Sequence, residues 1–171
     1  MDKPIPDHIK AAMPHTTQYP ELGTGPVPVE PLISAELFEL ERERIFKRMW
    51  LKVGRVEEIA EPGDFKIKRI AVARTSAIIV RGKDGQIRAF HNLCTHRGNK
   101  LVPQSNDETN DETFGRAKAH LMTCRFHAWT FGTDGSLRGV PRKEAFADLD
   151  TSCLGLKPIH CEVWEGFIFI N

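Results

Sequence analysis

The spacing of hydrophobic positions changes near residue 50. Before that point, six apolar residues recur at helical spacing: Leu37, Phe38, Ile45, Phe46, Met49 and Trp50. Ser34 is a favoured N-cap residue, and Glu36 places a carboxylate in the first turn. The pattern predicts an amphipathic helix over residues 35–49, with its apolar stripe packed in the core.

After Trp50 the apolar runs are short and are separated by turn sequences. Three turn clusters stand out: Pro62-Gly63-Asp64, Gly82-Lys83-Asp84-Gly85 and Gly132-Thr133-Asp134-Gly135. Strands are predicted between and after these turns, at residues 65–73, 76–81, 87–91, 120–124 and 136–140 and within 158–171. Regularly spaced short strands favour a mostly β domain with antiparallel sheets.

Two segments differ from this framework. Residues 1–33 hold seven of the eleven prolines and are expected to be extended, because proline restricts φ and removes a backbone donor. We therefore divide the chain into a proline-rich segment, 1–33, and one domain, 34–171. The sequence Asn-Asp-Glu-Thr occurs twice in succession at 106–113, and its lack of aliphatic residues predicts a solvated loop.

Composition limits the class of protein. The 171 residues are 40% hydrophobic and 27% charged, with a formal net charge of +1, which is typical of one globular domain. The charge gives no indication of a nucleic-acid or membrane partner. No signal sequence or membrane-length apolar run is present, so a cytoplasmic protein is expected.

Two short motifs contain the candidate chemistry: Cys94-Thr95-His96-Arg97-Gly98 and Cys124-Arg125-Phe126-His127-Ala128-Trp129. Each supplies one thiolate and one imidazole, so two facing loops could hold two adjacent irons. Replacing two thiolates of a [2Fe–2S] cluster by neutral histidines raises its potential, from roughly −400 mV to roughly −150 to +300 mV. A structural zinc module is the alternative, since two Cys and two His also suit zinc. Zinc modules usually group Cys with Cys and His with His, however, whereas here they alternate.

The sequence resembles the Rieske domain of the large (alpha) subunit of aromatic-ring-hydroxylating oxygenases. The resemblance runs from about Pro31 to Asn171 and includes both motifs, the segments Val53-Gly54-Arg55 and Gly139-Val140-Pro141, and the ending Trp164-Glu165-Gly166-Phe167-Ile168-Phe169-Ile170-Asn171. It implies a Rieske-type antiparallel β sandwich with a cluster-binding subdomain and one N-terminal helix.

The resemblance also implies how a [2Fe–2S] cluster would be held. Cys94 and Cys124 would bind the inner iron, while His96 and His127 would bind the outer iron near the surface. Arg97, Gly98, Phe126 and Trp129 would shape the pocket around the cluster. Backbone N–H groups of both loops would donate to the sulfurs, with Gly98 allowing close approach of the backbone.

The chain departs from related patterns at two places. The interval between His96 and Cys124 is longer than is usual in the family, mainly because of the 106–113 repeat. Respiratory Rieske proteins add a disulfide between the two loops, but the matching positions here are Asn99 and Phe126. This difference favours the oxygenase or ferredoxin branch. We expect Cys153 and Cys161 to be buried apolar residues, and His91, His120 and His160 to be structural strand residues.

The implied function is one-electron transfer. Family members continue into a domain with a mononuclear non-haem iron, whose Asp-x₂-His-x₄-His motif does not occur here. We therefore expect this chain alone to be unable to hydroxylate a substrate. It would receive electrons from a ferredoxin or flavin reductase and pass them to an iron of a neighbouring alpha subunit in an oligomer. The family expectation for the substrate is an aromatic compound. A free-standing Rieske ferredoxin is the other interpretation.

Overall fold

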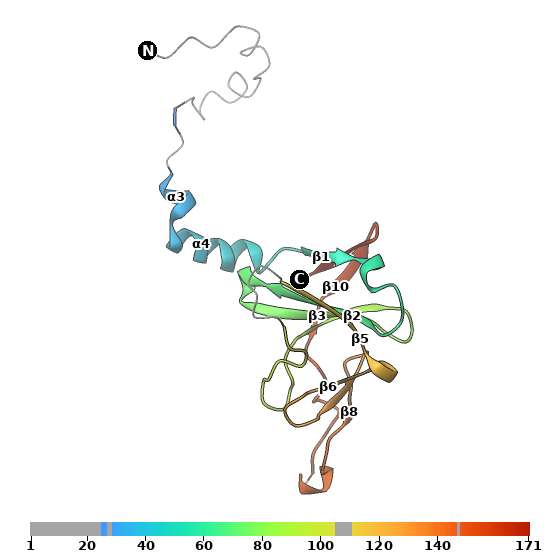
Figure 1. Ribbon diagram of the computed structural model, residues 1–171. Helices are drawn as coiled ribbons and strands as arrows, with labels where there is room; N and C mark the ends of the chain where they lie inside the picture. The colour runs from blue at the N-terminus through green and yellow to red at the C-terminus, as the bar shows by residue number, and fades with distance from the viewer. Residues whose placement is uncertain (1–24, 27–28, 105–110, 147) are drawn as a thin grey trace. The chain divides into compact units, whose positions relative to one another are not determined.

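The computed structural model describes residues 25–26, 29–104, 111–146 and 148–171. The chain divides into two compact units after Phe38. Within the described residues, all strands belong to the second unit, Glu39–Asn171 (Figure 1). The candidate cluster-binding motifs lie in this unit as well.

Helical segments precede the strands. α3 spans Glu30–Ile33 and α4 spans Ala35–Glu41. The backbone N–H of Leu37 donates to Ser34 Oγ at 3.1 Å, which confirms Ser34 as the cap of α4. The expectation of an extended chain is wrong for Glu30–Ile33, because Pro31 falls in the first turn, where its missing N–H costs no helical hydrogen bond. Residues 1–24 and 27–28 of the proline-rich segment lie outside the described residues.

The predicted helix 35–49 is shorter and less regular than expected. α4 ends at Glu41 and is followed by a π-helix, η2, at Arg42–Phe46, in which the Lys47 N–H donates to the Arg42 carbonyl oxygen at 3.1 Å. A π turn contains more residues than an α turn and so rotates later side chains out of the 3.6-residue pattern.

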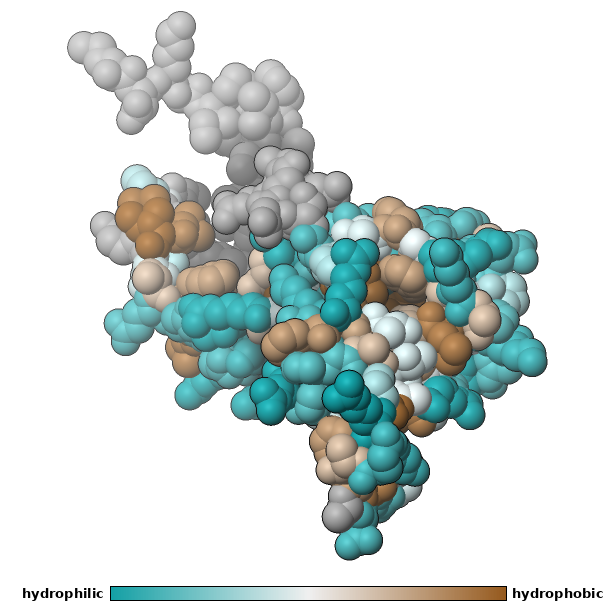
Figure 2. Space-filling view, turned by 60° about the horizontal axis from the view of Figure 1, so that its bottom comes forward, coloured by the Kyte–Doolittle hydropathy of each residue, from teal (hydrophilic) through white to brown (hydrophobic). Residues whose placement is uncertain are grey.

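The apolar stripe of this segment is not in the core, which corrects the sequence prediction. Phe38, Ile45, Met49 and Trp50 are each between 45% and 48% exposed. Hydrophobic periodicity shows that one face of a helix is apolar, but it does not show what covers that face. Figure 2 shows hydrophilic residues over much of the visible face of the strand-bearing unit, with smaller apolar areas between them.

The strands form three antiparallel sheets. The central sheet has the order β5-β2-β3-β4-β9, and its strands are Glu112–Arg116, Asp64–Ile70, Thr75–Arg81, Ile87–His91 and Pro158–Ile159. The second has the order β1-β11-β10, with Leu51–Arg55, Phe167–Ile170 and Cys161–Trp164. The third has the order β6-β7-β8, with Leu121–Thr123, Thr130–Gly132 and Leu137–Gly139. Short 3₁₀ segments connect them at Val56–Ile59 (η3), Ala71–Ala73 (η4), Lys118–His120 (η5) and Lys143–Ala145 (η6).

Strand β3 shows how the core is divided. Ile78 and Val80 belong to one hydrophobic cluster, which also contains Phe131 and Trp129. The alternate residues Ala77 and Ile79 belong to a second cluster, which contains Val53 and Ile168 of the β1-β11-β10 sheet. Successive side chains of a strand point to opposite faces, so the central sheet packs on both sides. The candidate cysteines belong to the first cluster.

Most of the predicted strands are confirmed in position: β4 has the predicted bounds, β3 begins one residue earlier, and β2, β6 and β8 are shorter than predicted. Residues 71–73 form η4 instead of extending β2, and the segment 158–171 is divided into β9, β10 and β11. Sequence analysis missed β1, β5 and β7. The prediction of a solvated loop is wrong for Glu112 and Thr113, which belong to β5; residues 106–110 of the repeat lie outside the described residues.

Three further expectations need correction. Cys153 is exposed instead of buried, and Cys161 is half-buried. His120 lies in η5 at a φ of 60°, before β6 instead of within it. His160 is exposed and lies between β9 and β10 instead of within a strand. Gly98 has a φ of 70°, a value that favours glycine, and a Cβ there would meet no protein atom within 4 Å.

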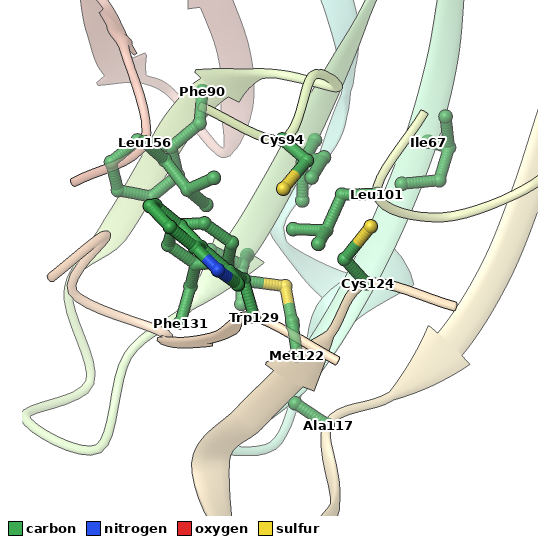
Figure 3. Packing of buried hydrophobic residues seen from close by; sticks show 12 residues of the cluster. Ile67, Phe90, Cys94, Leu101, Ala117, Met122, Cys124, Trp129, Phe131 and Leu156 are labelled. Atoms are coloured by element: carbon green, nitrogen blue, oxygen red, sulfur yellow. The ribbon is translucent and has the colours of Figure 1, made fainter. Parts of the chain in front are cut away.

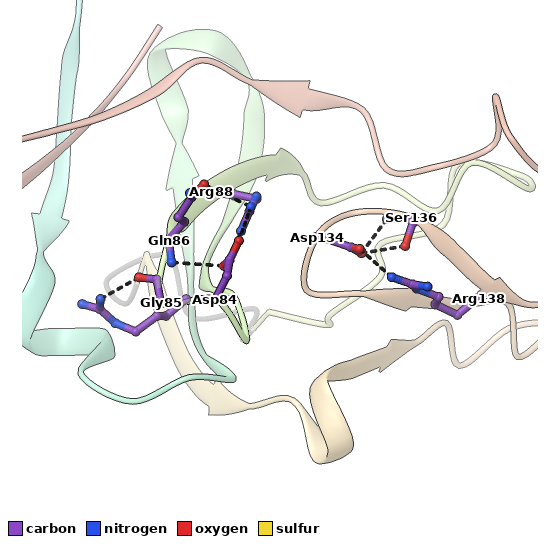
Figure 4. Close-up of polar contacts among 8 residues, drawn as sticks. Asp84, Gly85, Gln86, Arg88, Asp134, Ser136 and Arg138 are labelled. Atoms are coloured by element: carbon purple, nitrogen blue, oxygen red, sulfur yellow. Dashed lines mark hydrogen bonds and ion pairs between the residues drawn. The ribbon is translucent and has the colours of Figure 1, made fainter.

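Two turns repeat the same local structure on different sheets. In each, an aspartate two residues after a glycine accepts a backbone N–H from the residue two positions later and pairs with an arginine four positions later. The pairs are Asp84 with Arg88 and Asp134 with Arg138 (Figure 4).

Within the described ranges, no helix has the length and apolar content to cross a membrane.

Candidate cluster-binding site

The two Cys–His motifs form loops at the ends of strands. The first loop, residues 94–99, follows β4, and the second, residues 124–129, joins β6 to β7. Strands β6 and β7 pair in register up to Thr123 and Thr130, whose hydroxyl oxygens are 3.0 Å apart. The second loop is therefore closed at its base by a short hairpin.

The backbones of the two loops are equivalent. In the first, Cys94 N–H donates to the Asn99 carbonyl and Gly98 N–H donates to the Cys94 carbonyl, both at 2.8 Å. In the second, Cys124 N–H donates to the Trp129 carbonyl at 2.8 Å and Ala128 N–H to the Cys124 carbonyl at 2.9 Å. Each loop thus closes on its own cysteine, with a positive-φ residue four positions later and a closing residue five positions later.

The two thiols form the buried half of the site. Cys94 is 3% exposed and Cys124 is 2% exposed, at the edge of the cluster that contains Leu101 and Trp129 (Figure 3). Burial raises the pKa of the Cys94 thiol. Burial also opposes ionisation of Cys124, but its pKa is lowered because the backbone N–H groups of Phe126 and His127, the Cys94 thiol and the Asn99 amide donate to its sulfur. These donors suit a thiolate sulfur.

The two imidazoles form the other half, closer to solvent. His96 and His127 are partly exposed, and their ring centroids are 4.7 Å apart at an interplanar angle of 71°. The pKa of His96 is lowered, first by burial and then by the charges of His127 and Arg97. For His96, the neutral imidazole, which is the form that binds metals, is therefore favoured.

The four residues expected around the cluster differ in their surroundings. Trp129 is buried and stacks on His96, with ring centroids 4.7 Å apart and planes 8° from parallel. Phe126 is 60% exposed, with its ring centroid 3.8 Å from that of His127. Arg97 is exposed, and Gly98 provides the left-handed turn of the first loop. Both aromatic side chains come from the second loop, and Arg97 adds an exposed cation from the first.

Buried polar side chains anchor the first loop, and sequence analysis did not single them out. The fully buried Asn92 donates to the Val102 carbonyl at 2.8 Å and accepts the Val102 N–H at 2.9 Å, which closes the segment on both sides of the loop. Thr95 Oγ1 donates to the Leu154 carbonyl at 2.6 Å. A buried amide with both functions satisfied fixes a loop more strongly than surface contacts would.

The donor set fits an inorganic cluster better than a single ion. Thiols are paired with thiols and imidazoles with imidazoles, although each loop contributes one of each. Two sulfur donors inside and two nitrogen donors outside match a cluster with two chemically different irons.

Such a site on an antiparallel β framework defines an iron–sulfur protein. The model of the Rieske [2Fe–2S] domain matches residues 49–156, more than half of the chain. The chain belongs to this family, and its cofactor is the [2Fe–2S] cluster of Rieske domains.

Known relatives identify the branch of the family. The chain is 38% identical over 139 residues to the alpha subunit of 2-aminobenzenesulfonate 2,3-dioxygenase from an Alcaligenes species, covering 80% of this chain and 32% of that protein. Among solved structures, it matches the quaternary ammonium Rieske monooxygenase CntA in complex with L-carnitine, with a TM-score of 0.73 and 35% identity over 84% of this chain and 38% of that one.

Naphthalene 1,2-dioxygenase from a Rhodococcus species, bound to indole, has a similar structure, with a TM-score of 0.74 and 29% identity over 85% of this chain and 31% of that chain. The resemblance to Rieske oxygenase alpha subunits is therefore confirmed. The chain spans about a third of the length of these relatives.

Proposed function

We propose that Cys94, His96, Cys124 and His127 hold a Rieske [2Fe–2S] cluster, and that the chain passes single electrons as the N-terminal domain of an oxygenase alpha subunit. The observation that supports this most strongly is the pairing of donors across the two loops. Two thiols are buried together, and two imidazoles stand together nearer the surface.

Each set of site residues has a different role in the proposed electron transfer. When bound, the cluster supplies a centre that accepts and releases one electron. The cysteines hold its inner side in an apolar pocket, where donors to sulfur stabilise negative charge. The histidines hold its outer side, and their partial exposure shortens the path to a partner. Trp129 stacks on the His96 ring and so restricts the rotation of that ring.

The named relatives support proposals for the partners and the substrate. We propose a ferredoxin or flavin reductase as donor and a mononuclear iron of a neighbouring alpha subunit as acceptor. The structure of a similar quaternary ammonium Rieske monooxygenase gave insights into inter-subunit electron transfer in that protein. We propose aromatic hydrocarbon catabolism as the pathway class, supported by the naphthalene and aminobenzenesulfonate dioxygenases. Relatives named for carnitine make L-carnitine the substrate against which naphthalene should be compared in a full-length subunit.

Metal analysis tests the ligand set. Protein purified without oxidants should contain about two irons and two acid-labile sulfides per chain. After reduction by dithionite it should give a Rieske-type EPR signal. His96→Cys and His127→Cys should each abolish that signal, because the outer iron would lose its imidazole. His160→Cys, which changes a histidine outside the loops, serves as the matched control and should keep it.

The same measurement distinguishes the alternatives. One zinc per chain without sulfide would contradict the cluster and support a structural zinc module. A normal Rieske signal in His127→Cys would contradict the assignment of that ligand.

A further inference from the structure

The closing residue of each loop reaches the opposite loop. Both Asn99 and Trp129 lie five positions after a cysteine and accept its backbone N–H. The Trp129 ring stacks on His96, a ligand candidate of the first loop. The Asn99 side chain approaches the sulfur of Cys124, in the second loop, at 3.9 Å. The two loops are therefore connected by a pair of crossed contacts.

The orientation of the Asn99 amide is fixed by a second contact. Its Nδ2 donates to the Lys100 carbonyl oxygen at 3.0 Å, and that oxygen can only accept. Nδ2 has two hydrogens, so the remaining one is available to the sulfur. A flipped amide would place its oxygen against the Lys100 carbonyl, which is repulsive. The group that faces Cys124 is consequently a donor.

The sulfur that receives this donor is almost completely buried. Cys124 is 2% exposed, so water contributes little to stabilising charge on its sulfur. Reduction adds one electron to a cluster, and part of the added charge lies on the sulfur ligands. A hydrogen bond to such a sulfur favours the reduced state and raises the potential. Asn99 is exposed on its other side and can be replaced without opening the core.

We infer that Asn99 is a positioning residue that tunes the reduction potential of the cluster, by donating a hydrogen bond from the first loop to Cys124 of the second. The inference rests on the proposed function. It assigns to the Asn99 side chain a donor role toward a sulfur of the opposite loop.

The test is a redox titration of reconstituted protein, followed by circular dichroism and by EPR of the reduced state. Asn99→Leu keeps the size of the side chain and removes the donor. Asn99→Asp keeps the shape and replaces the donor by an oxygen. We expect the equilibrium constant for reduction to fall about three- to tenfold in Asn99→Leu, the range of one hydrogen bond. A tenfold fall corresponds to about 59 mV for a one-electron couple. Asn99→Asp should lower the equilibrium constant for reduction further, because an oxygen would then face the sulfur.

Thr95→Val is the matched control. It removes the Thr95–Leu154 hydrogen bond of the same loop and keeps the Asn99 side chain that faces Cys124. We expect Thr95→Val to lower stability and to shift the potential less than Asn99→Leu does, because the donor to Cys124 is kept. An equal shift in Thr95→Val and Asn99→Leu would overturn the inference, because loosening of the loop would then explain both.

The outcomes separate this inference from the proposed function. Iron and sulfide are measured in every sample, and Asn99→Asp provides the test if Asn99→Leu does not assemble. A wild-type protein without a [2Fe–2S] cluster overturns the proposed function and the role of Asn99 with it. A normal cluster whose potential is unchanged in both Asn99 variants overturns the role of Asn99 alone.

Discussion

Gly98 and Ala128 occupy the same place in the two loops, four residues after a cysteine. Both have positive φ, 70° for Gly98 and 57° for Ala128. The left-handed region costs an L-residue about 1–2 kcal/mol and costs glycine nothing. The first loop therefore has the residue that its backbone favours, whereas the second keeps a strained alanine beside His127.

Exchanging the two residue types should reveal this difference. We expect Gly98→Ala to lower the free energy of unfolding by about 1 kcal/mol, since the added Cβ meets nothing within 4 Å and only the backbone is affected. Ala128→Gly should raise it by about 0.5 kcal/mol, because relief of strain exceeds the added freedom of the unfolded chain. Urea denaturation measures both. A change of the same sign in the two variants would contradict the explanation.

At the scale of elements, a buried lysine connects β2 to η3 and β5. The Lys66 side chain is 1% exposed, and its Nζ lies 2.6 Å from Glu58 Oε2 and 3.0 Å from Glu112 Oε1. The Phe114 ring centroid lies 5.3 Å from the same nitrogen. Burial raises the pKa of Glu112, but hydrogen bonds from Lys68 and Lys66 outweigh it and lower the pKa overall. Glu112, near the end of the acidic repeat, thus pairs with the buried ammonium group of Lys66.

Removing one partner of this group should cost more than replacing the lysine. We expect Glu58→Gln to destabilise the domain by about 1–2 kcal/mol, because a buried charge loses a partner. The free energy of unfolding of Lys66→Met should stay within about 1 kcal/mol of wild type, because an apolar side chain leaves no buried positive charge that needs a partner. The double variant should be no less stable than Lys66→Met. Denaturant unfolding at pH 7 tests this order, and a Lys66→Met variant less stable than Glu58→Gln would contradict it.

The Asp–Arg turns between β3 and β4 and between β7 and β8 lead to a prediction about stability at low pH. Hydrogen bonding from Arg88 lowers the pKa of Asp84 to about 2, against an ordinary value of 3.8. A lowered carboxyl pKa contributes stability above the ordinary pKa, and this contribution is lost as the pH falls through the folded value. Wild type should therefore be more stable than Asp84→Asn above pH 4, and the two should converge near pH 2. Thermal unfolding across this range measures the difference, and Arg88→Gln should behave like Asp84→Asn.

For the molecule as a whole, charge is unevenly distributed around the candidate site. Neither residues 85–104 nor residues 113–133, which contain the two loops, include an aspartate or glutamate. Arg97, Lys100 and Arg125 are exposed. The ion pairs found in the described ranges do not involve these three side chains. Arg97 and Arg125 thus place positive charge next to His96 and His127 along the two loops, and we propose that an electron donor with an acidic face docks there.

Electron transfer from such a donor should depend on salt. We expect the association rate of a reduced acidic ferredoxin to fall steeply with ionic strength, and Arg125→Glu to lower it at least several-fold at low salt. Lys52→Glu makes the same change in net charge on β1, in the sheet packed on the opposite face of the central sheet from the cysteines. This control should keep the wild-type rate. Stopped-flow reduction measures all three proteins, and equal slowing in the two variants would contradict docking at the loops.

The candidate metal ligands and the mostly β framework can both be read from the sequence alone. Cys94-x-His96 and Cys124-x₂-His127 are local patterns, and the donor types that they contain indicate the cofactor before any folding is considered. Strands β3 and β4 were also predictable, because their apolar runs end at turns whose glycines and aspartates are local signals.

Features that depend on which segments meet could be found only in the folded structure. The exposed stripe of 35–49, the strand β5 at the end of the acidic repeat and the paired charges of Lys66 all depend on neighbours distant in sequence. The same holds for Asn99, whose sulfur partner is 25 residues away along the chain. Local patterns specify what a side chain can do, whereas packing specifies the group on which it acts, because contact between loops requires the sheets beneath them to assemble first.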